Sequence, residues 1–493
     1  AAHSELAQKA SMHTHAPDIT KDEKNNKTNI SNTMKKDLLT LSLISVSAMA
    51  SAQGISNEMI ERFAEQNKIS GCEKVVRNAL AAGPVSAIAL NQDNQTETNT
   101  YFSNSVPSKG ITDQKSSGRC WLFSGLNVMR AKMMNEQKLS TPLTFSQNYL
   151  FFYDQLEKAN LFLQAIIDTR KKDTDDRTVD WLLNNPLSDG GTFTGVADLV
   201  MKYGIVPSGV MPETYASDNT NQFTTFLKRK LREDALALRA NSKMNDKQLL
   251  AMKEKQLSEI YRMLSLAFGT PVKEFVWAPK DSEGKTVCEP KKYTPMSFYK
   301  EYINLDLHDD FIMLMNDPSR EYWKTYEIEY DRHTYDGHNW KYVNVPMDDI
   351  KAAAIASIKD STSMYFSCDV SKCLDKRGIA DLNNFNYDEI FGVKFGMDKA
   401  QRIKSHDSGS THAMTLMAVD INADGKPTKW KVENSWGAAS GHNGHIIMTD
   451  EWFDNYMFRL VVDKKYVSDK IIKANEQKPV MLPCWDPMFS AEN

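Results

Sequence analysis

The sequence predicts an α+β fold, with a helical part over residues 54–221 and a remainder over 271–480 that ends in antiparallel β structure. Apolar residues recur with helical spacing from Leu122 to Met133, directly after a Ser-Gly turn. The C-terminal third instead alternates short apolar strands with turns, most clearly over 411–437. Between these parts, residues 222–270 contain two charged amphipathic helices separated by a polar break at 241–246, so we expect a helical hairpin inserted into the main fold.

Composition narrows the class of protein. The chain has 493 residues, enough for about two to three domains or one large domain with insertions. Its net charge is −4, from 60 basic and 64 acidic residues, so no strong positive field suggests nucleic-acid binding. The six cysteines include no CxxC pair, which argues against a disulfide scaffold or a structural zinc site. Cys368 ends an apolar segment typical of a buried strand, and we interpret it and Cys373 as structural rather than as half of a metal site.

The first 52 residues have the features of a leader. Residues 1–33 are polar and lack apolar periodicity, so we expect them to be disordered or to lie upstream of the mature protein. Residues 34–52 contain a short basic start, an apolar run of about a dozen residues and an A-x-A end, the pattern of a secretory signal peptide. We therefore expect a periplasmic or secreted protein, or a cytoplasmic one if the signal is not used. The run is too short for a comfortable membrane span, and no other candidate span follows.

Cys120 is the residue best suited to act as a nucleophile. It follows the Ser-Gly turn at the predicted start of a helix, where unpaired backbone N–H groups and the positive end of the helix dipole favour a thiolate over a thiol. Gln114, six residues upstream, supplies an amide that can donate to an oxyanion forming beside the sulfur. By itself this pattern fits a redox or structural thiol equally well, so the decision depends on whether the chain supplies a base.

Among ten histidines, His412 has the surroundings that suit a general base. It begins a predicted strand, and the returning strand of the hairpin carries Asn434 near its end. An asparagine oxygen that accepts from one ring nitrogen fixes the imidazole tautomer and leaves the other nitrogen facing the thiol. The other histidines show no comparable pattern. His308, His333 and His338 lie in polar surroundings with no partner pattern nearby, and His442 and His445 lie in a glycine-rich loop with no third ligand, so we predict no metal site from them.

Together these residues resemble the papain-like cysteine peptidases, and further segments resemble the bleomycin hydrolase and aminopeptidase C family within that group. The motifs are Ser-Gly-Arg-Cys-Trp at 117–121, Asp-Gly-Gly at 189–191, Asn-Ser-Trp-Gly at 434–437 and Trp-Asp-Pro-Met at 485–488. The resemblance implies a papain-like fold, in which a helical sub-domain faces an antiparallel β sub-domain. It also implies the roles of four residues. Cys120 is the nucleophile, and His412 acts first as general base and then as general acid. Asn434 orients the imidazole, and Gln114 donates to the oxyanion.

The same resemblance implies further roles around the site. Gly190 and Gly191 are expected to pair with an extended peptide substrate, and Trp436 is expected to shield the His–Asn hydrogen bond. Arg119 is open to two interpretations, because its charge can either stabilise the thiolate or anchor the start of the helix. No cofactor and no metal are implied.

The C-terminal arm, residues 481–493, is expected to decide which peptides are cut. In the family that the sequence resembles, this arm lies in the cleft and its terminal carboxylate receives the α-ammonium group of the substrate. Here the arm departs from the family's usual Gly-Ala-Leu-Ala ending. The carboxylate that meets the substrate is therefore the terminus at Asn493, the Glu492 side chain, or a new terminus made by trimming.

We therefore expect a thiol aminopeptidase that acts on peptides with a free N-terminus. The resemblance also implies a homohexamer with its active sites facing a central channel. Two alternatives remain open. One is a papain-like endopeptidase whose cleft the altered tail does not block. The other is a nucleic-acid-binding or scaffolding hexamer, which the near-neutral net charge does not favour.

Overall fold

The computed structural model describes residues 54–96, 99–136 and 143–490. The predicted leader and signal segment lie outside these residues. The chain divides into two compact units, Ala1–Ile88 and Ala89–Asn493, so the boundary falls inside the helical part predicted over 54–221. None of the helices within the described ranges is both long enough and apolar enough to cross a bilayer.

The described part of the first unit is helical. Ser56 caps the first helix by accepting a hydrogen bond from the N–H of Met59, and Ser70 forms a capping box with Glu73 at the start of the second. A short third helix leads into the second unit. These helices are α2 (Asn57–Gln66), α3 (Gly71–Ala82) and α4 (Val85–Ala89).

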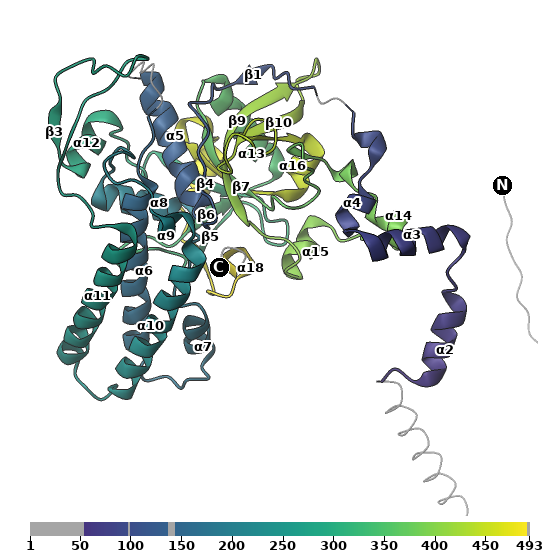
Figure 1. Ribbon diagram of the computed structural model, residues 1–493, viewed down its shortest axis with the longest axis horizontal. Helices are drawn as coiled ribbons and strands as arrows, with labels where there is room; N and C mark the ends of the chain where they lie inside the picture. Colours follow the sequence, from purple (N-terminus) through teal and green to yellow (C-terminus); the bar gives the residue numbers. More distant parts are fainter. Residues whose placement is uncertain (1–53, 97–98, 137–142, 491–493) are drawn as a thin grey trace, which may run out of the picture. The chain divides into compact units, whose positions relative to one another are not determined.

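A helical layer forms one side of the second unit, where α6, α10 and α11 lie side by side and α5 runs between this layer and the sheet (Figure 1). Helix α8 ends at Gly204, whose φ of +71° and close approach to the backbone of Pro295 leave no room for a side chain. The helices are α5 (Cys120–Glu136), α6 (Gln147–Asp168), α7 (Arg177–Asn184), α8 (Phe193–Tyr203), α9 (Tyr215–Asp218), α10 (Thr220–Ala240), α11 (Asp246–Phe268) and α12 (Pro295–Tyr302).

A large mixed sheet forms the other side of the second unit, and its strand order is β13-β5-β6-β4-β12-β7-β9-β10-β11-β8, with β1 paired to β9. The part that carries His412 and Asn434 is antiparallel, as predicted, because β7 with β9, β9 with β10 and β10 with β11 are antiparallel pairs. Elsewhere the sheet is mixed, since β13 with β5, β4 with β6 and β11 with β8 are parallel pairs. The strands of this sheet are β1 (Asn104–Ser105), β4 (Phe311–Met315), β5 (Lys324–Ile328), β6 (Lys341–Asn344), β7 (Met364–Cys368), β8 (Ile379–Ala380), β9 (His412–Ile421), β10 (Pro427–Glu433), β11 (His445–Thr449), β12 (Met457–Asp463) and β13 (Val480–Leu482).

The remaining elements are short or lie beside the sheet. A separate two-stranded sheet pairs β2 (Phe275–Trp277) with β3 (Lys291–Tyr293). The other helices are α13 (Met347–Lys359), α14 (Tyr387–Phe391), α15 (Lys399–Lys404), α16 (Asp450–Tyr456), α17 (Asp469–Asn475) and α18 (Pro487–Ser490), with single 3₁₀ turns at Gln92–Asn94, Leu382–Asn384 and Lys464–Tyr466.

The hairpin of β9 and β10 is the element that places the predicted base. Its turn is closed by the N–H of Asn422 donating to the carbonyl of Lys426 at 2.9 Å, with Gly425 at a φ of +78°. The two strands then run antiparallel as far as the pair Glu433 and Thr415. The hairpin therefore brings the residue that begins β9 and the residue that follows β10 to the same end of the sheet.

Candidate active site

Cys120 is the first residue of α5, and the loop before it is held in place by Asp189. The carboxylate of Asp189 accepts hydrogen bonds from the backbone N–H of Gly118 at 2.7 Å and from the hydroxyl of Thr220. A Cβ on Gly118 would lie 2.4 Å from that carboxylate, so this approach requires glycine. Trp121 donates from its ring N–H to the backbone carbonyl of Asp189 at 2.9 Å. The partly exposed thiol therefore sits on a rigid helix start.

His412 and Asn434 meet at the end of the β9–β10 hairpin. The Nε2 of His412 lies 2.8 Å from the Oδ1 of Asn434, and because an amide oxygen only accepts, Nε2 carries the proton. The neutral imidazole then presents its bare Nδ1 as a base. Burial lowers the pKa of His412 to about 4, and the hydrogen bond that its Nε2 donates to Asn434 opposes this effect. An imidazolium in this position therefore needs a negatively charged partner.

The thiolate of Cys120 can be that partner, because Cys120 and His412 line the same cavity. Cys120, His412 and Gln114 all line it, so the structure brings together three groups that lie up to 298 residues apart in the sequence. The ring of Trp436 lies over that of His412, with 4.7 Å between the ring centroids, and so covers the imidazole. Cys368, in the neighbouring strand, is fully buried, and burial raises its pKa well above the ordinary value, so it stays a thiol.

Ser435 links the orienting amide to the oxyanion donor, a role that the sequence reasoning missed. Its backbone N–H donates to the Oδ1 of Asn434 at 2.8 Å, and its hydroxyl donates to the Oε1 of Gln114 at 2.6 Å. The backbone N–H of Gln114 in turn donates to the carbonyl of Ser435 at 2.8 Å. One N–H of the Gln114 amide donates to the carbonyl of Ser117 at 2.6 Å. Gln114 lines the cavity of Cys120, and its amide nitrogen carries a second N–H.

Arg119 anchors the helix start and does not serve as a charge beside the thiol. Its side chain is fully buried, and its Nη1 lies 2.7 Å from Glu213 while Nη2 lies 3.8 Å from Asp218. Its Nε donates to the hydroxyl of Ser117 at 3.0 Å. It is not among the residues that line the cavity with Cys120. The structure thus decides between the two interpretations that the sequence left open.

The Gly190–Gly191 segment lines the cavity and is supported from behind by a buried polar cluster. Lys158 donates from Nζ to the carbonyl of Gly190 at 2.6 Å and lies 3.1 Å from the carboxylate of Asp154. His333 lies 2.5 Å from Asp154, and a Cβ on Gly191 would come within 2.2 Å of its ring. The interpretation of His333 as a residue in polar surroundings without a partner is wrong, because it is buried and paired.

The C-terminal arm is bound beside the same cavity. Strand β13 pairs with β5, and Arg320 forms an ion pair with Asp486. Arg459, which lines the cavity of Cys120, donates from Nη2 to the carbonyl of Met488 at 2.9 Å. Phe489 lines a second cavity, which adjoins the first because Gly190 and Gly191 line both. The predicted amine-binding groups at Glu492 and Asn493 lie outside the described residues.

The fold and the Cys–His–Asn arrangement together define the papain-like class of cysteine peptidases. The chain belongs to the Peptidase C1-like family, whose model matches residues 54–489. Among curated relatives, it is 37% identical over 451 residues to human bleomycin hydrolase, covering 89% of this chain and 99% of that protein. It is also 37% identical over 438 residues to aminopeptidase C of Listeria monocytogenes, covering 88% of this chain and 98% of that protein.

A solved structure agrees with this assignment. The crystal structure of PepW from Lactobacillus rhamnosis superposes with a TM-score of 0.84 at 35% sequence identity, covering 89% of this chain and 99% of that one. The predicted papain-like α+β fold is therefore confirmed over nearly all of the described chain.

Proposed function

We propose that this protein is a thiol aminopeptidase, which removes residues from the N-terminus of peptides. The observation that carries the proposal is the shared cavity of Cys120 and the His412–Asn434 pair, with the C-terminal arm bound beside it. The names of the relatives, bleomycin hydrolase and aminopeptidase C, support the same activity.

The geometry assigns the first half of the reaction. The bare Nδ1 of His412 takes the proton of the Cys120 thiol, and the resulting thiolate and imidazolium stabilise each other in the buried site. The sulfur attacks the carbonyl carbon of the scissile peptide bond. As negative charge develops on the carbonyl oxygen, the Cys120 backbone N–H and the second amide N–H of Gln114 donate hydrogen bonds to it. The imidazolium then gives its proton to the leaving amine, and an acyl-enzyme thioester remains.

Hydrolysis of the thioester uses the same groups in reverse. Water gives a proton to Nδ1 of His412 as its oxygen attacks the thioester carbonyl, and the thiolate leaves. Throughout, Asn434 holds the imidazole through Nε2, and Ser435 holds Asn434 and Gln114 in a fixed relation. The Gly190–Gly191 segment is placed to pair with the backbone of the peptide, since both glycines line the cavity.

The arm accounts for the preference for chain ends. Phe489 of the arm lines the cavity that continues from the catalytic one at Gly190 and Gly191, so the arm forms part of the wall that a bound peptide meets there. The test compares peptides with free and acetylated N-termini in the wild-type protein and in two deletions. Removing residues 487–493 is expected to create cleavage of the acetylated peptide. Removing only residues 491–493 distinguishes the contribution of the terminal carboxylate from that of the rest of the arm. If the longer deletion yields no cleavage of acetylated peptides, the arm does not limit the cleft.

Assembly as a homohexamer is also proposed. The proposal is supported by large apolar side chains on α10 and α11 that are exposed, with Leu266 at 78%, and that are available for contacts between copies. The exposed apolar residues of these two helices are Phe226, Leu236, Leu250, Tyr261 and Leu266. Light scattering on the eluting protein is expected to give six times the mass of one chain, and a monomer would contradict the proposal.

Export through the signal at residues 34–52 is proposed on the sequence pattern alone. Fractionation of the source cells, with mass spectrometry of the mature N-terminus, is expected to find the processed protein outside the cytoplasm. An unprocessed cytoplasmic protein would contradict it.

A further inference from the structure

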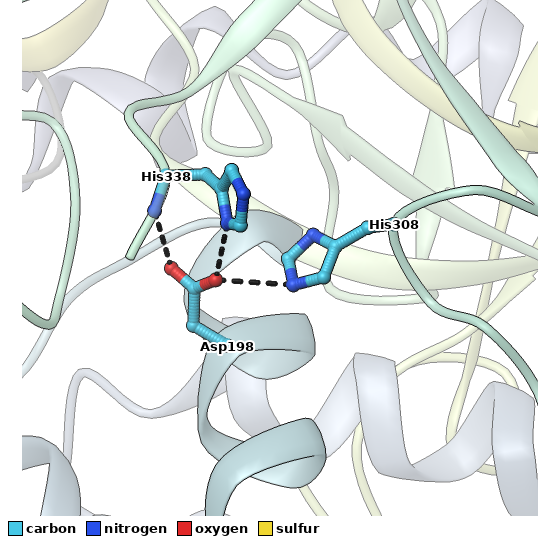
Figure 2. Close-up of side chains that lie close together, drawn as sticks. All are labelled: Asp198, His308 and His338. Atoms are coloured by element: carbon cyan, nitrogen blue, oxygen red, sulfur yellow. Dashed lines mark hydrogen bonds and ion pairs between the residues drawn. The ribbon is translucent and has the colours of Figure 1, made fainter. Parts of the chain in front are cut away.

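Three side chains outside the active site meet in a cluster that has the composition of a metal site. Asp198 comes from α8, His308 from the loop before β4, and His338 from the loop before β6 (Figure 2). Their ligand atoms all lie within 4.8 Å of one another. The view of His308 and His338 as histidines without partners is thus wrong, because both point at one carboxylate.

The carboxylate is oriented before any ion arrives. Oδ2 of Asp198 accepts the backbone N–H of His338 at 2.9 Å, which leaves Oδ1 to face both imidazoles. Oδ1 lies 2.8 Å from Nδ1 of His338 and 3.1 Å from Nε2 of His308. A Cβ at position 337 would come within 2.3 Å of Oδ2, so Gly337 lets the loop approach this closely. The two imidazole rings lie together, with their centroids 4.2 Å apart.

These distances are close to what zinc requires. Zinc bonds of about 2.0–2.1 Å in a tetrahedral arrangement place neighbouring ligand atoms about 3.3 Å apart. The two Asp198–histidine separations of 2.8 and 3.1 Å therefore need to open by only about half an ångström or less. Such movement is available because His338 is 64% exposed and can adjust, whereas Asp198 is 5% exposed and fixed.

We propose that Asp198, His308 and His338 bind a zinc ion, with water in the fourth position. Two imidazole nitrogens and one carboxylate are a ligand set that zinc accepts with an open site. Binding replaces the two protons that now lie between the rings and Oδ1. A neutral ring carries its one proton on the other nitrogen when it coordinates, and a ring that starts as an imidazolium also releases one proton to solvent, so each ligand nitrogen is bare.

The ion would join three segments that are separate in the sequence, two of which adjoin the Gly190–Gly191 segment. Asp198 lies on the helix that follows the Gly190–Gly191 segment, and His338 lies on the loop that also carries His333, which contacts Gly191. Zinc at this point therefore ties the helix to that loop and stabilises the folded chain by mass action. The proposal does not depend on the peptidase activity.

The test uses the full chain with Cys120→Ala, so that the catalytic thiol cannot hold the metal. Zinc chloride titrated by calorimetry is expected to bind with one equivalent per chain and to raise the melting temperature. His308→Ala and His338→Ala are each expected to weaken binding by at least about 10–100-fold, the range seen when mere supporting partners of a site are removed. His442→Ala, in a loop histidine outside the cluster, serves as the matched control and should bind normally.

Cobalt provides a readout of the ligands themselves. Cobalt(II) added to the same protein is expected to give the visible absorption of a four-coordinate nitrogen and oxygen site, and His338→Ala should remove it. Because His338 is largely exposed, that variant is expected to fold normally. The proposal is overturned if no equivalent of zinc binds, or if zinc binding or the melting shift survives in both His308→Ala and His338→Ala.

Discussion

Asp331 provides a test of the electrostatics beside the cleft. It is 2% exposed and lines the cavity that Phe489 also lines. Burial raises the pKa of its carboxyl to about 7, with Arg459 opposing and Asp486 adding to the rise. The folded state therefore holds this proton more tightly than the unfolded chain, whose carboxyl has an ordinary value of 3.8. Stability from this group is complete below the unfolded value and is lost as the pH rises through about 7.

The size of the effect follows from the two values. A difference of roughly three units corresponds to about 4 kcal/mol at 1.36 kcal/mol per unit. Asp331→Asn keeps the shape and removes the charge, so the variant should be more stable than wild type by about 2 kcal/mol near pH 5 and by about 4 kcal/mol near pH 8. The growth of this gap with pH is the diagnostic result.

The assay is equilibrium unfolding in urea at the two pH values, with the variant compared with wild type at each. Asp424→Asn, an exposed residue of the β9–β10 turn, is the matched control and should show no gap at either pH. A gap of constant size, or an Asp331→Asn protein less stable than wild type near pH 8, would refute the reasoning.

Three further outcomes are expected. Gly191→Ala should lower kcat/KM by about 100-fold, because its Cβ would displace the ring of His333 or the segment itself, and adding His333→Ala should recover part of the loss; full activity in the single variant would contradict this. Ser435→Ala should lower kcat by about 10-fold at unchanged KM while Ser435→Thr retains activity, and a change confined to KM would contradict the positioning role. Arg119→Leu should lower the free energy of unfolding in urea by about 3 kcal/mol, because it leaves Glu213 without its partner, and should leave the pH profile of Cys120 alkylation unchanged. A shifted profile would show that the charge of Arg119 stabilises the thiolate.

Local sequence patterns predict several elements of the fold. The helix break predicted near 241–246 separates α10 from α11, because Asn245 caps the second helix and polar residues precede it. The buried strand ending at Cys368 and the hairpin of β9 and β10 are also where hydrophobic runs and turn residues predict them. The parallel strand pairs could not be predicted, since they join segments far apart in the chain and leave no local signal.

In the active site too, features that depend on local sequence are predictable, and features that depend on contacts between distant segments are not. Cys120 is recognisable from a turn followed by a helix, and His412 with Asn434 from a single hairpin. Ser435 belongs to the Asn-Ser-Trp-Gly motif, but its role could not be predicted. Its hydroxyl and its carbonyl both bond to Gln114, which is 321 residues away in the sequence.

Side-chain pairs between residues far apart in the sequence could not be predicted. His333 and Asp154 are 179 residues apart, and His338 and Asp198 are 140 residues apart, so neither pair has a spacing that suggests contact. Arg119 finds Glu213 at a separation of 94 residues, which is why the sequence could not choose between its two roles.

The central claim is that His412 activates Cys120, and the pH dependence of Cys120 alkylation by iodoacetamide tests it most directly. Mass spectrometry of the Cys120 peptide separates this thiol from the exposed Cys72 and Cys288. In wild type we expect rapid alkylation that persists well below the ordinary thiol range, because the imidazolium holds the thiolate. In His412→Ala we expect a single rise at higher pH. Identical profiles for the two proteins would contradict the account.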